Sequence, residues 1–189
     1  KNAGLLRVLK GGKVDLFKIN CNAIGFSIAP LINGVARMDE IKLAIDILLE
    51  DDDKVCMKLR LKMFKINEAR KERQKEIVEQ YLKNVDSDQK VLIVLDEQSS
   101  KGFNGIVAQQ LSDRYKRPVI VGRLYNGVIS GSFRSYNNFQ FKSFLNKFEG
   151  EIEALGHEGA GGIVLNESLL PELIEFINKN LPELEDREP

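Results

Sequence analysis

The stretch "NGIVAQQLSDRYKRPVIVGRLYNGVISGSFRS", residues 104–135, decides the fold because it contains a helix, a strand, a turn and a second strand. We predict a helix over 104–116, with Asn104 as its N-cap and with Pro118 preventing its continuation. Apolar, β-branched runs predict strands over 118–124 and 127–135. Tyr125-Asn126-Gly127 is typical of a hairpin turn, so the two strands should pair.

Segments on both sides of this stretch complete an α/β domain. The run "KVLIVLDE" predicts a buried strand. Further downstream, the patterns predict a helix over 139–149, a strand over 161–165 and a final helix over 170–180. The order β-α-β-β-α-β-α indicates a small mixed-sheet α/β domain.

The chain upstream of this domain reads as a long helix. Residues 54–83 contain no glycine or proline, and residues 67–76 are almost entirely polar. A helix that is polar all round usually bridges two bodies, and thirty helical residues extend about 45 Å. Residues 38–50 form an amphipathic pattern, with Asp39 as a possible N-cap. We therefore predict a long helix joining the α/β domain to a mainly helical N-terminal remnant.

Composition excludes several classes of protein. The 189 residues carry 28 basic and 28 acidic side chains, so a globally basic surface is excluded. Cys21 and Cys56 lack metal-ligand spacing and are expected to be reduced thiols of a cytoplasmic protein. No apolar run approaches the roughly 18 residues that span a bilayer, so no membrane contact is expected. With one histidine, and no recognisable nucleophile, we expect neither catalytic residues nor metal ligands in this chain.

Three loops have the character of anion-binding segments. "GSFRS" (131–135) places Arg134 between two hydroxyls, and the guanidinium plane suits phosphate. "SSKGFNG" (99–105) leads into a helix N-terminus, which favours anions, and "GHEGAGG" (156–162) holds the single histidine. Taken singly, these features also fit a surface charge, an ordinary loop and a structural histidine. Together they favour a phosphate-bearing ligand.

The motifs also resemble those of a known family. "GHEGAGG" resembles the G-G-H-x-x-A-x-G signature of the DHH-associated domain, found in DHH phosphoesterases and alanyl-tRNA synthetases. The order of the three loops resembles the RecJ branch, which comprises single-strand-specific 5′→3′ DNA exonucleases. "IAPLINGVARMDE" (28–40) resembles the RecJ-type pattern I-x-P-R-I-N-A-A-G-R. Leu31, Phe133 and Leu155 depart from the family patterns, which indicates a divergent member, with a phage as one possible source.

The resemblance implies a division of the chain into three parts. Residues 1–53 would be the C-terminal remnant of the catalytic DHH domain, 54–87 the connecting helix, and 88–189 the DHH-associated substrate-binding domain. The catalytic metal ligands, and the Mn²⁺ or Mg²⁺ that they hold, would lie in a DHH domain upstream of residue 1. This chain alone is therefore expected to be inactive, and residues 1–53 should be partly mobile or expose apolar surface.

The resemblance also assigns roles to residues. Arg134 would hold a phosphate near the cleaved end, His157 would bond a phosphate oxygen, and Phe133 could stack on a base. Lys142 and Lys147 are predicted to lie outside the cleft. The candidate substrate-binding residues are Arg37, Lys101, Asn104, Gly131, Ser132, Arg134, Ser135, Gly156, His157, Ala160, Gly161 and Gly162.

The function implied is the substrate-binding portion of a RecJ-like exonuclease, monomeric, with single-stranded DNA as its partner and RNA or short oligonucleotides as further ligands. One alternative is a DHH-family phosphodiesterase for short oligonucleotides or cyclic dinucleotides. Another is a catalytically inert nucleic-acid- or protein-binding module, for which Leu31 and Leu155 are the best evidence. The 28–40 stretch and the long helix favour the first interpretation.

Overall fold

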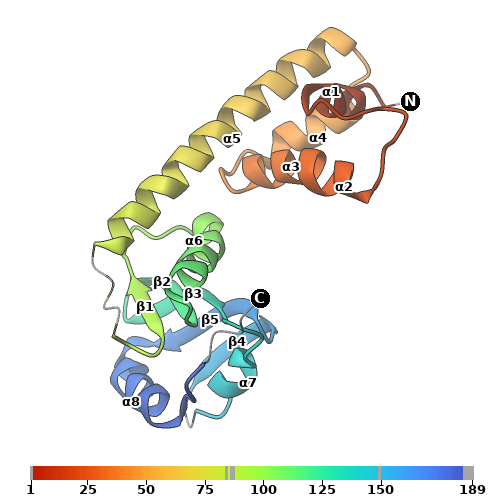
Figure 1. Cartoon of the computed structure of the whole chain (residues 1–189). Helices are drawn as coiled ribbons and strands as arrows, with labels where there is room; N and C mark the ends of the chain where they lie inside the picture. Colours follow the sequence, from red (N-terminus) through yellow and green to blue (C-terminus); the bar gives the residue numbers. More distant parts are fainter. Residues whose placement is uncertain (1, 84, 86–87, 149, 185–189) are drawn as a thin grey trace. The chain divides into compact units, whose positions relative to one another are not determined.

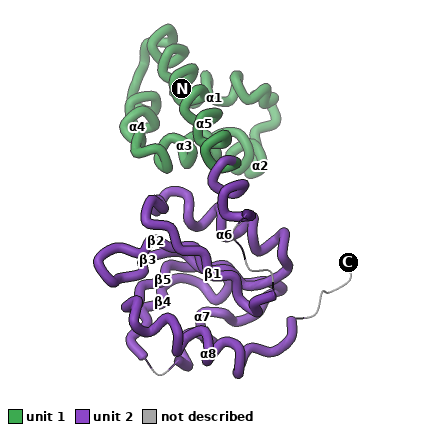
Figure 2. The backbone as a smooth tube through the Cα atoms, turned by 90° about the vertical axis from the view of Figure 1, so that its left-hand side faces the viewer, with its two compact units in different colours: residues 1–75 green, residues 76–189 purple. Residues whose placement is uncertain are grey.

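The computed structural model describes residues 2–83, 85, 88–148 and 150–184. It divides into two compact units, residues 1–75 and residues 76–189, coloured separately in Figure 2. Unit 1 is helical, and unit 2 combines a mixed sheet with helices, so the predicted α/β class is confirmed. The roles predicted for 1–53, 54–87 and 88–189 stay predictions.

Unit 1 is built from short helices packed around one apolar core. Its helices are α1 (Ala3–Gly11), α2 (Cys21–Ala23), the π-helical turn η1 (Ile24–Ile28), α3 (Ala29–Ala36), α4 (Ile41–Leu49) and the first part of α5. The buried residues of this core are Val8, Leu31, Val35, Leu43, Ala44, Ile47, Cys56 and Met63. Leu31 thus packs in the interior, at the position where the RecJ-type pattern has arginine.

The amphipathic helix predicted over 38–50 forms as α4, but it begins later and buries a different face. Asp39 has a positive φ of 59° and precedes the helix, whose N-cap is Glu40. The predicted apolar stripe is Ile41, Ala44, Ile45, Leu48 and Leu49, but Ile45 and Leu49 are exposed. The most exposed apolar side chains of unit 1 are Phe17 (98%) and Phe26 (82%), which confirms the prediction of exposed apolar surface in residues 1–53.

The long helix is continuous, as predicted. α5 runs from Asp53 to Leu82, thirty residues without a break (Figure 1). Its first half is not a free rod, however, because Cys56 and Met63 are fully buried in the core of unit 1. The apolar spacing of this half therefore serves packing within unit 1. At the start of the polar middle, Asn67 is also buried, and it lies against Gly34 of α3.

Unit 2 contains a five-stranded sheet in the order β1-β2-β3-β5-β4. The strands are β1 (Leu92–Leu95), β2 (Val119–Tyr125), β3 (Val128–Arg134), β4 (Ile152–His157) and β5 (Ala160–Asn166). β1 pairs with β2 in parallel, and the other pairs are antiparallel. The β2–β3 turn has positive φ at Asn126 and Gly127, which confirms the predicted hairpin.

Sequence reasoning missed β4. The segment around His157 was expected to be a loop, but it is a β-hairpin in which His157 pairs with Ala160 and Gly156 with Gly161. Ile152 and Ala154 face the core and are separated by Glu153, a period-two pattern that could have predicted a strand. The predicted order therefore lacked one strand before the last.

The helices of unit 2 cover both faces of the sheet. They are α6 (Lys101–Tyr115), α7 (Phe141–Leu145) and α8 (Leu170–Asn180), the last preceded by the 3₁₀ turn η2 (Glu167–Leu169). Figure 2 shows the sheet with α6 on one side and α7 and α8 on the other. The prediction of Asn104 as N-cap is wrong: α6 begins at Lys101 after Ser100. Phe103 is buried, and its packing stabilises the additional turn.

Candidate nucleic-acid interface

The register of the sheet brings two of the predicted motifs together. Arg134 on β3 pairs with Ala160 on β5, which in turn pairs with His157 on β4. Cross-strand partners share a face of the sheet, so Arg134 and His157 lie on one face with two strand spacings, about 10 Å, between their backbones. The residues of "GSFRS" and of the histidine segment are therefore neighbours.

A second row lies one step along the same face. Ser132 on β3 pairs with Gly162 on β5, and Gly162 pairs with Leu155 on β4. Phe133 lies between Ser132 and Arg134 in the sequence, so alternation directs it to the opposite face. The polar residues of "GSFRS" thus face away from the core that buries Phe133.

Helix α6 adjoins this face where Gly105 meets β3. A Cβ atom at Gly105 would lie 2.8 Å from Arg134 Nη2 and 3.7 Å from Ser132 Oγ. The absence of a side chain there allows the guanidinium to lie against the first turns of α6. Arg134 Nη1 also donates to the Phe133 carbonyl oxygen at 2.7 Å, and this bond orients the Arg134 side chain. Sequence reasoning missed Gly105, although a glycine inside a helix usually has a packing reason.

A groove of about 270 Å³ opens between α6 and the uncovered part of this sheet face. Its lining residues are Lys101, Asn104, Ser130, Gly131, Ser132, Glu153, Leu155, Gly162, Ile163 and Val164. Cationic and hydroxyl side chains come from α6 and β3, whereas apolar side chains and one carboxylate come from β5 and β4. This groove combines a helix N-terminus, a lysine and hydroxyls, which together favour an anionic group.

The loop between β1 and α6 is braced at the edge of the groove. Asn104 is 3% exposed, and its Oδ1 accepts a hydrogen bond from the Ser99 hydroxyl. Asp96 accepts from the Gln98 backbone N–H at 2.8 Å and from the Tyr81 hydroxyl at 3.0 Å. Asn104 therefore holds the loop that presents Lys101, in addition to lining the groove.

Two predicted contact residues have internal roles instead. Phe133 is 0% exposed and packs edge-on against Phe141 with ring centroids 5.7 Å apart, so its predicted stacking on a base is wrong. The reason is that the single residue between two outward-facing side chains of a strand points inward. Ser135 lies beyond β3, and its hydroxyl donates to the Phe139 carbonyl oxygen at 2.6 Å. This hydroxyl fastens the β3–α7 connection.

Most of the predicted glycines serve close packing of the strands. A Cβ at Gly161 would overlap the Leu155 carbonyl oxygen and lie 2.7 Å from the Phe133 ring. Gly131 similarly faces the β2 backbone, and Gly156 has a φ of 125° that L side chains rarely adopt. Gly162 differs, because the nearest atom to its Cβ position is 3.8 Å away. Of these four, Gly131 and Gly162 line the groove, and only Gly162 has open space where a Cβ would lie.

The hairpin turn after His157 is tied to α7. Glu158 Oε2 accepts from the Ser143 backbone N–H at 2.9 Å, and Oε1 accepts from the Ser143 hydroxyl at 2.8 Å. These bonds to the charged form lower the pKa of Glu158. Lys142 Nζ donates to the Gly156 carbonyl oxygen at 3.1 Å. Lys142 is therefore part of this support, and Lys147, which is exposed, is the suitable bystander.

Arg37 belongs to unit 1, and the other predicted site residues belong to unit 2. Arg37 follows the last residue of α3 and lies close enough to Arg70 to lower its pKa, after the larger effect of burial. Arg70 Nε donates to Asn67 Oδ1 at 3.0 Å. Within unit 1, Arg37 therefore has a basic neighbour, Arg70.

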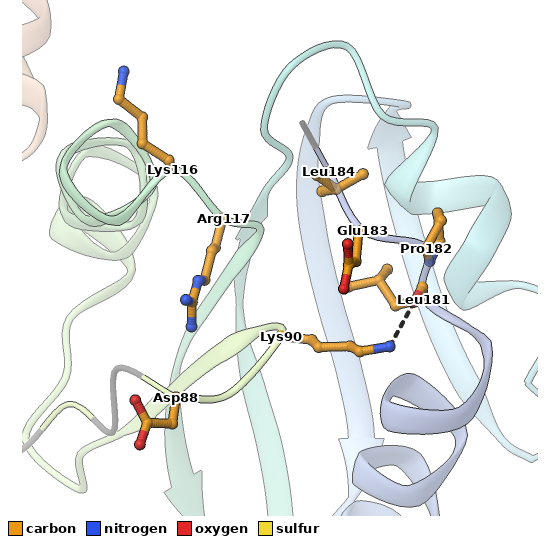
Figure 3. A pocket seen from close by; sticks show the side chains of 8 residues that line it. All are labelled: Asp88, Lys90, Lys116, Arg117, Leu181, Pro182, Glu183 and Leu184. Atoms are coloured by element: carbon orange, nitrogen blue, oxygen red, sulfur yellow. Dashed lines mark hydrogen bonds between the residues drawn. The ribbon is translucent and has the colours of Figure 1, made fainter. Parts of the chain in front are cut away.

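A larger cavity of about 350 Å³ lies elsewhere on unit 2 (Figure 3). Lys90 Nζ donates to the Leu181 carbonyl oxygen at 2.9 Å, and Arg117 Nη1 donates to the Gln89 carbonyl oxygen at 2.7 Å. Lys116 points away from Arg117 in this view, and the carboxylates of Asp88 and Glu183 share the lining. Lys90 and Arg117 fasten backbone segments, so the groove beside α6 is the better candidate.

The described residues do not fit a catalytic metal. No group of three or more His, Cys, Asp or Glu side chains that could hold an ion occurs among residues 2–83, 85, 88–148 and 150–184. Over the same part of the chain, no helix has the length and apolarity to cross a membrane.

β3, which carries Arg134, pairs with β5 of the hairpin that contains His157. This mixed sheet has the α/β fold of the DHH-associated type. No protein-family profile matches the chain. In sequence and fold, however, the chain is similar to RecJ proteins along almost its whole length.

Three comparisons support this similarity. The single-stranded-DNA-specific exonuclease RecJ of Bacillus subtilis is 27% identical over 182 residues, covering 93% of this chain and 23% of that protein. The crystal structure of RecJ in complex with Mn²⁺ from Thermus thermophilus has a TM-score of 0.79 at 25% identity, covering 94% of this chain and 26% of that one. A RecJ structure bound to manganese has a TM-score of 0.74 at 27% identity, covering 96% and 46%. The chain thus spans about a quarter of the length of the Bacillus subtilis protein.

Proposed function

We propose that unit 2 binds single-stranded nucleic acid in the groove beside α6, as the substrate-binding part of a RecJ-like 5′→3′ single-stranded DNA exonuclease. The observation that carries the proposal is the convergence of Arg134 and Ser132 on the first turns of α6, next to Lys101. The relatives named as single-stranded-DNA-specific exonucleases support the choice of ligand. Hydrolysis would need a metal centre, which the described residues do not assemble.

The groove suits a phosphate for electrostatic reasons. α6 has no acidic residue in its first turn, so its N-terminal dipole is not offset there. Lys101 adds a cation at the first helical position. Arg134 on β3 does not line the groove itself, but its guanidinium lies against Gly105 of α6 beside the groove and adds a planar donor there. Ser130 and Ser132 supply hydroxyls on the same face. A phosphate at this end of the groove would meet donors from two elements.

The test compares Arg134→Ala with Lys147→Ala in the full 189-residue chain. Both changes remove one positive charge, but Lys147 is exposed and follows α7, on the other side of the sheet. Binding of a fluorescent single-stranded oligonucleotide would be measured by anisotropy at several salt concentrations. We expect Arg134→Ala to weaken binding about tenfold or more, as for loss of a charge-assisted hydrogen bond.

Salt dependence adds a second readout. The log–log slope should be about 0.7 for each phosphate neutralised on a single strand, and Arg134→Ala should reduce it. Lys147→Ala should change neither affinity nor slope appreciably. Equal weakening by both changes would show that binding is diffuse and that the groove is not the site.

A further inference from the structure

The wall of the groove opposite α6 carries a carboxylate that the proposed phosphate contacts do not use. Glu153 on β4 lines the groove and pairs across the sheet with Val164 on β5. Within the part of the chain that the structure describes, the Glu153 carboxylate has no hydrogen-bond or ion-pair partner. A carboxylate only accepts hydrogen bonds and repels phosphate, so it is suited to a ligand group that donates.

Between this carboxylate and the hydroxyls of β3 lies an apolar strip. Leu155 is 62% exposed and Val164 is 39% exposed, although both are large apolar side chains of a sheet. Gly162 pairs with Leu155 and leaves the backbone between Leu155 and Ser132 uncovered. A flat apolar surface open to solvent suits the face of a planar ring, as in binding of unpaired bases.

Across the groove, the groups suited to a phosphate therefore lie at one end and the groups suited to a base at the other, as phosphate and base do in a nucleotide. Donors for phosphate lie on α6 and β3. The uncovered backbone of Gly162 and the side chain of Val164 lie on β5, and Leu155 and the Glu153 carboxylate lie on β4. The volume of about 270 Å³ is just below the range of about 300–1,000 Å³ typical of drug-sized ligands. The groove thus has room for a single small group such as one base.

We infer that this groove selects among nucleobases: Leu155 and Gly162 receive the face of one base, and the Glu153 carboxylate accepts a hydrogen bond from its exocyclic amino group. Cytosine and adenine carry such an amino donor, whereas thymine presents a carbonyl acceptor at the position corresponding to that of cytosine. A thymine carbonyl beside Glu153 would face a second acceptor. The inference rests on the proposed function, because it assumes that a strand occupies the groove.

The test uses 5′-phosphorylated oligo(dC) and oligo(dT) of equal length, because the two pyrimidines differ at the position that Glu153 would read. Wild type, Glu153→Gln and Glu151→Gln chains would be titrated by anisotropy. Glu151 is the matched control, since it is exposed and precedes β4 but does not line this groove. We expect wild type and Glu151→Gln to prefer oligo(dC) by about threefold or more, which is a small part of a full base-edge contact.

Glu153→Gln should bring the oligo(dC)/oligo(dT) ratio to about one, because an amide can serve either base as donor or acceptor. Leu155→Gly should weaken both oligonucleotides without changing the salt slope. Equal affinities of the wild type for the two oligonucleotides, or equal changes of the ratio by Glu151→Gln and Glu153→Gln, would overturn the inference. Failure of the wild type to bind either oligonucleotide would instead refute the proposed function itself.

Discussion

Replacing Gly105 by alanine should weaken oligonucleotide binding while leaving the stability of unit 2 nearly unchanged. In a helix, glycine is about 0.8–1.0 kcal/mol less favourable than alanine, so Gly105→Ala stabilises α6 itself. The new Cβ would lie 2.8 Å from Arg134 Nη2, and the guanidinium must move away. Because the contact is with the end of a flexible side chain, the backbone of β3 can remain in place.

The cost of that movement follows from the bond that Arg134 makes. Its hydrogen bond to the Phe133 carbonyl oxygen contributes about 0.5–1.5 kcal/mol if it is lost completely. The two effects nearly cancel, so the free energy of unfolding should change by no more than about 1 kcal/mol. Binding should weaken, by contrast, because the guanidinium no longer lies against the first turns of α6.

The measurement is a double-mutant cycle of Gly105→Ala and Arg134→Ala, with urea unfolding and oligonucleotide anisotropy on each chain. If Gly105 acts through Arg134, the double variant should bind about as weakly as Arg134→Ala alone. Additive losses, or wild-type affinity of Gly105→Ala, would refute the reasoning. Gly161→Ala serves as a contrast, because its Cβ would overlap backbone and a buried ring, and unit 2 should be strongly destabilised.

Two further predictions concern the support of the site. Glu158 accepts hydrogen bonds that lower its pKa, so its contribution to stability should be complete above the ordinary carboxyl value of 4.5 and be lost as pH falls below it. Thermal unfolding of wild type and Glu158→Gln should therefore differ at neutral pH and converge in acid, whereas a constant difference would contradict the assignment. Phe133→Ala should reduce the free energy of unfolding by about 3–5 kcal/mol in denaturant titrations, because the ring is fully buried. A loss below 1 kcal/mol would show that the ring is not part of the core.

Local signals in the sequence determined much of the fold. The thirty-residue helix was predictable because its residues favour helix individually and no glycine or proline interrupts them. The β2–β3 hairpin was predictable because Asn126 and Gly127 tolerate the positive φ of that turn. Both features depend on neighbours in the chain. The start of α6 was missed because burial of Phe103 outweighed the capping preference of Asn104.

The motifs of the site were visible in the sequence, but their partners were not. Arg134, Ser132 and His157 could be selected as residue types beside glycines, and the register confirms that they share one face. Lys142 and Glu158, in contrast, act through contacts 14 and 15 residues away in the chain. Gly105 acts through Arg134, which comes from another element. No local pattern contains such contacts.

The direction of the side chains in "GSFRS" shows where sequence reasoning ends. Period-two alternation determined that Phe133 lies opposite Ser132 and Arg134, but it could not determine which face of the strand is covered. Packing of Phe141 against Phe133 closes one face, and the groove beside α6 leaves the other open. Burial is a property of the whole assembly of strands and helices, because a face is removed from water only when distant segments cover it. The tertiary structure alone therefore decided that Phe133 is core and that Leu155, Gly162 and Glu153 line a groove.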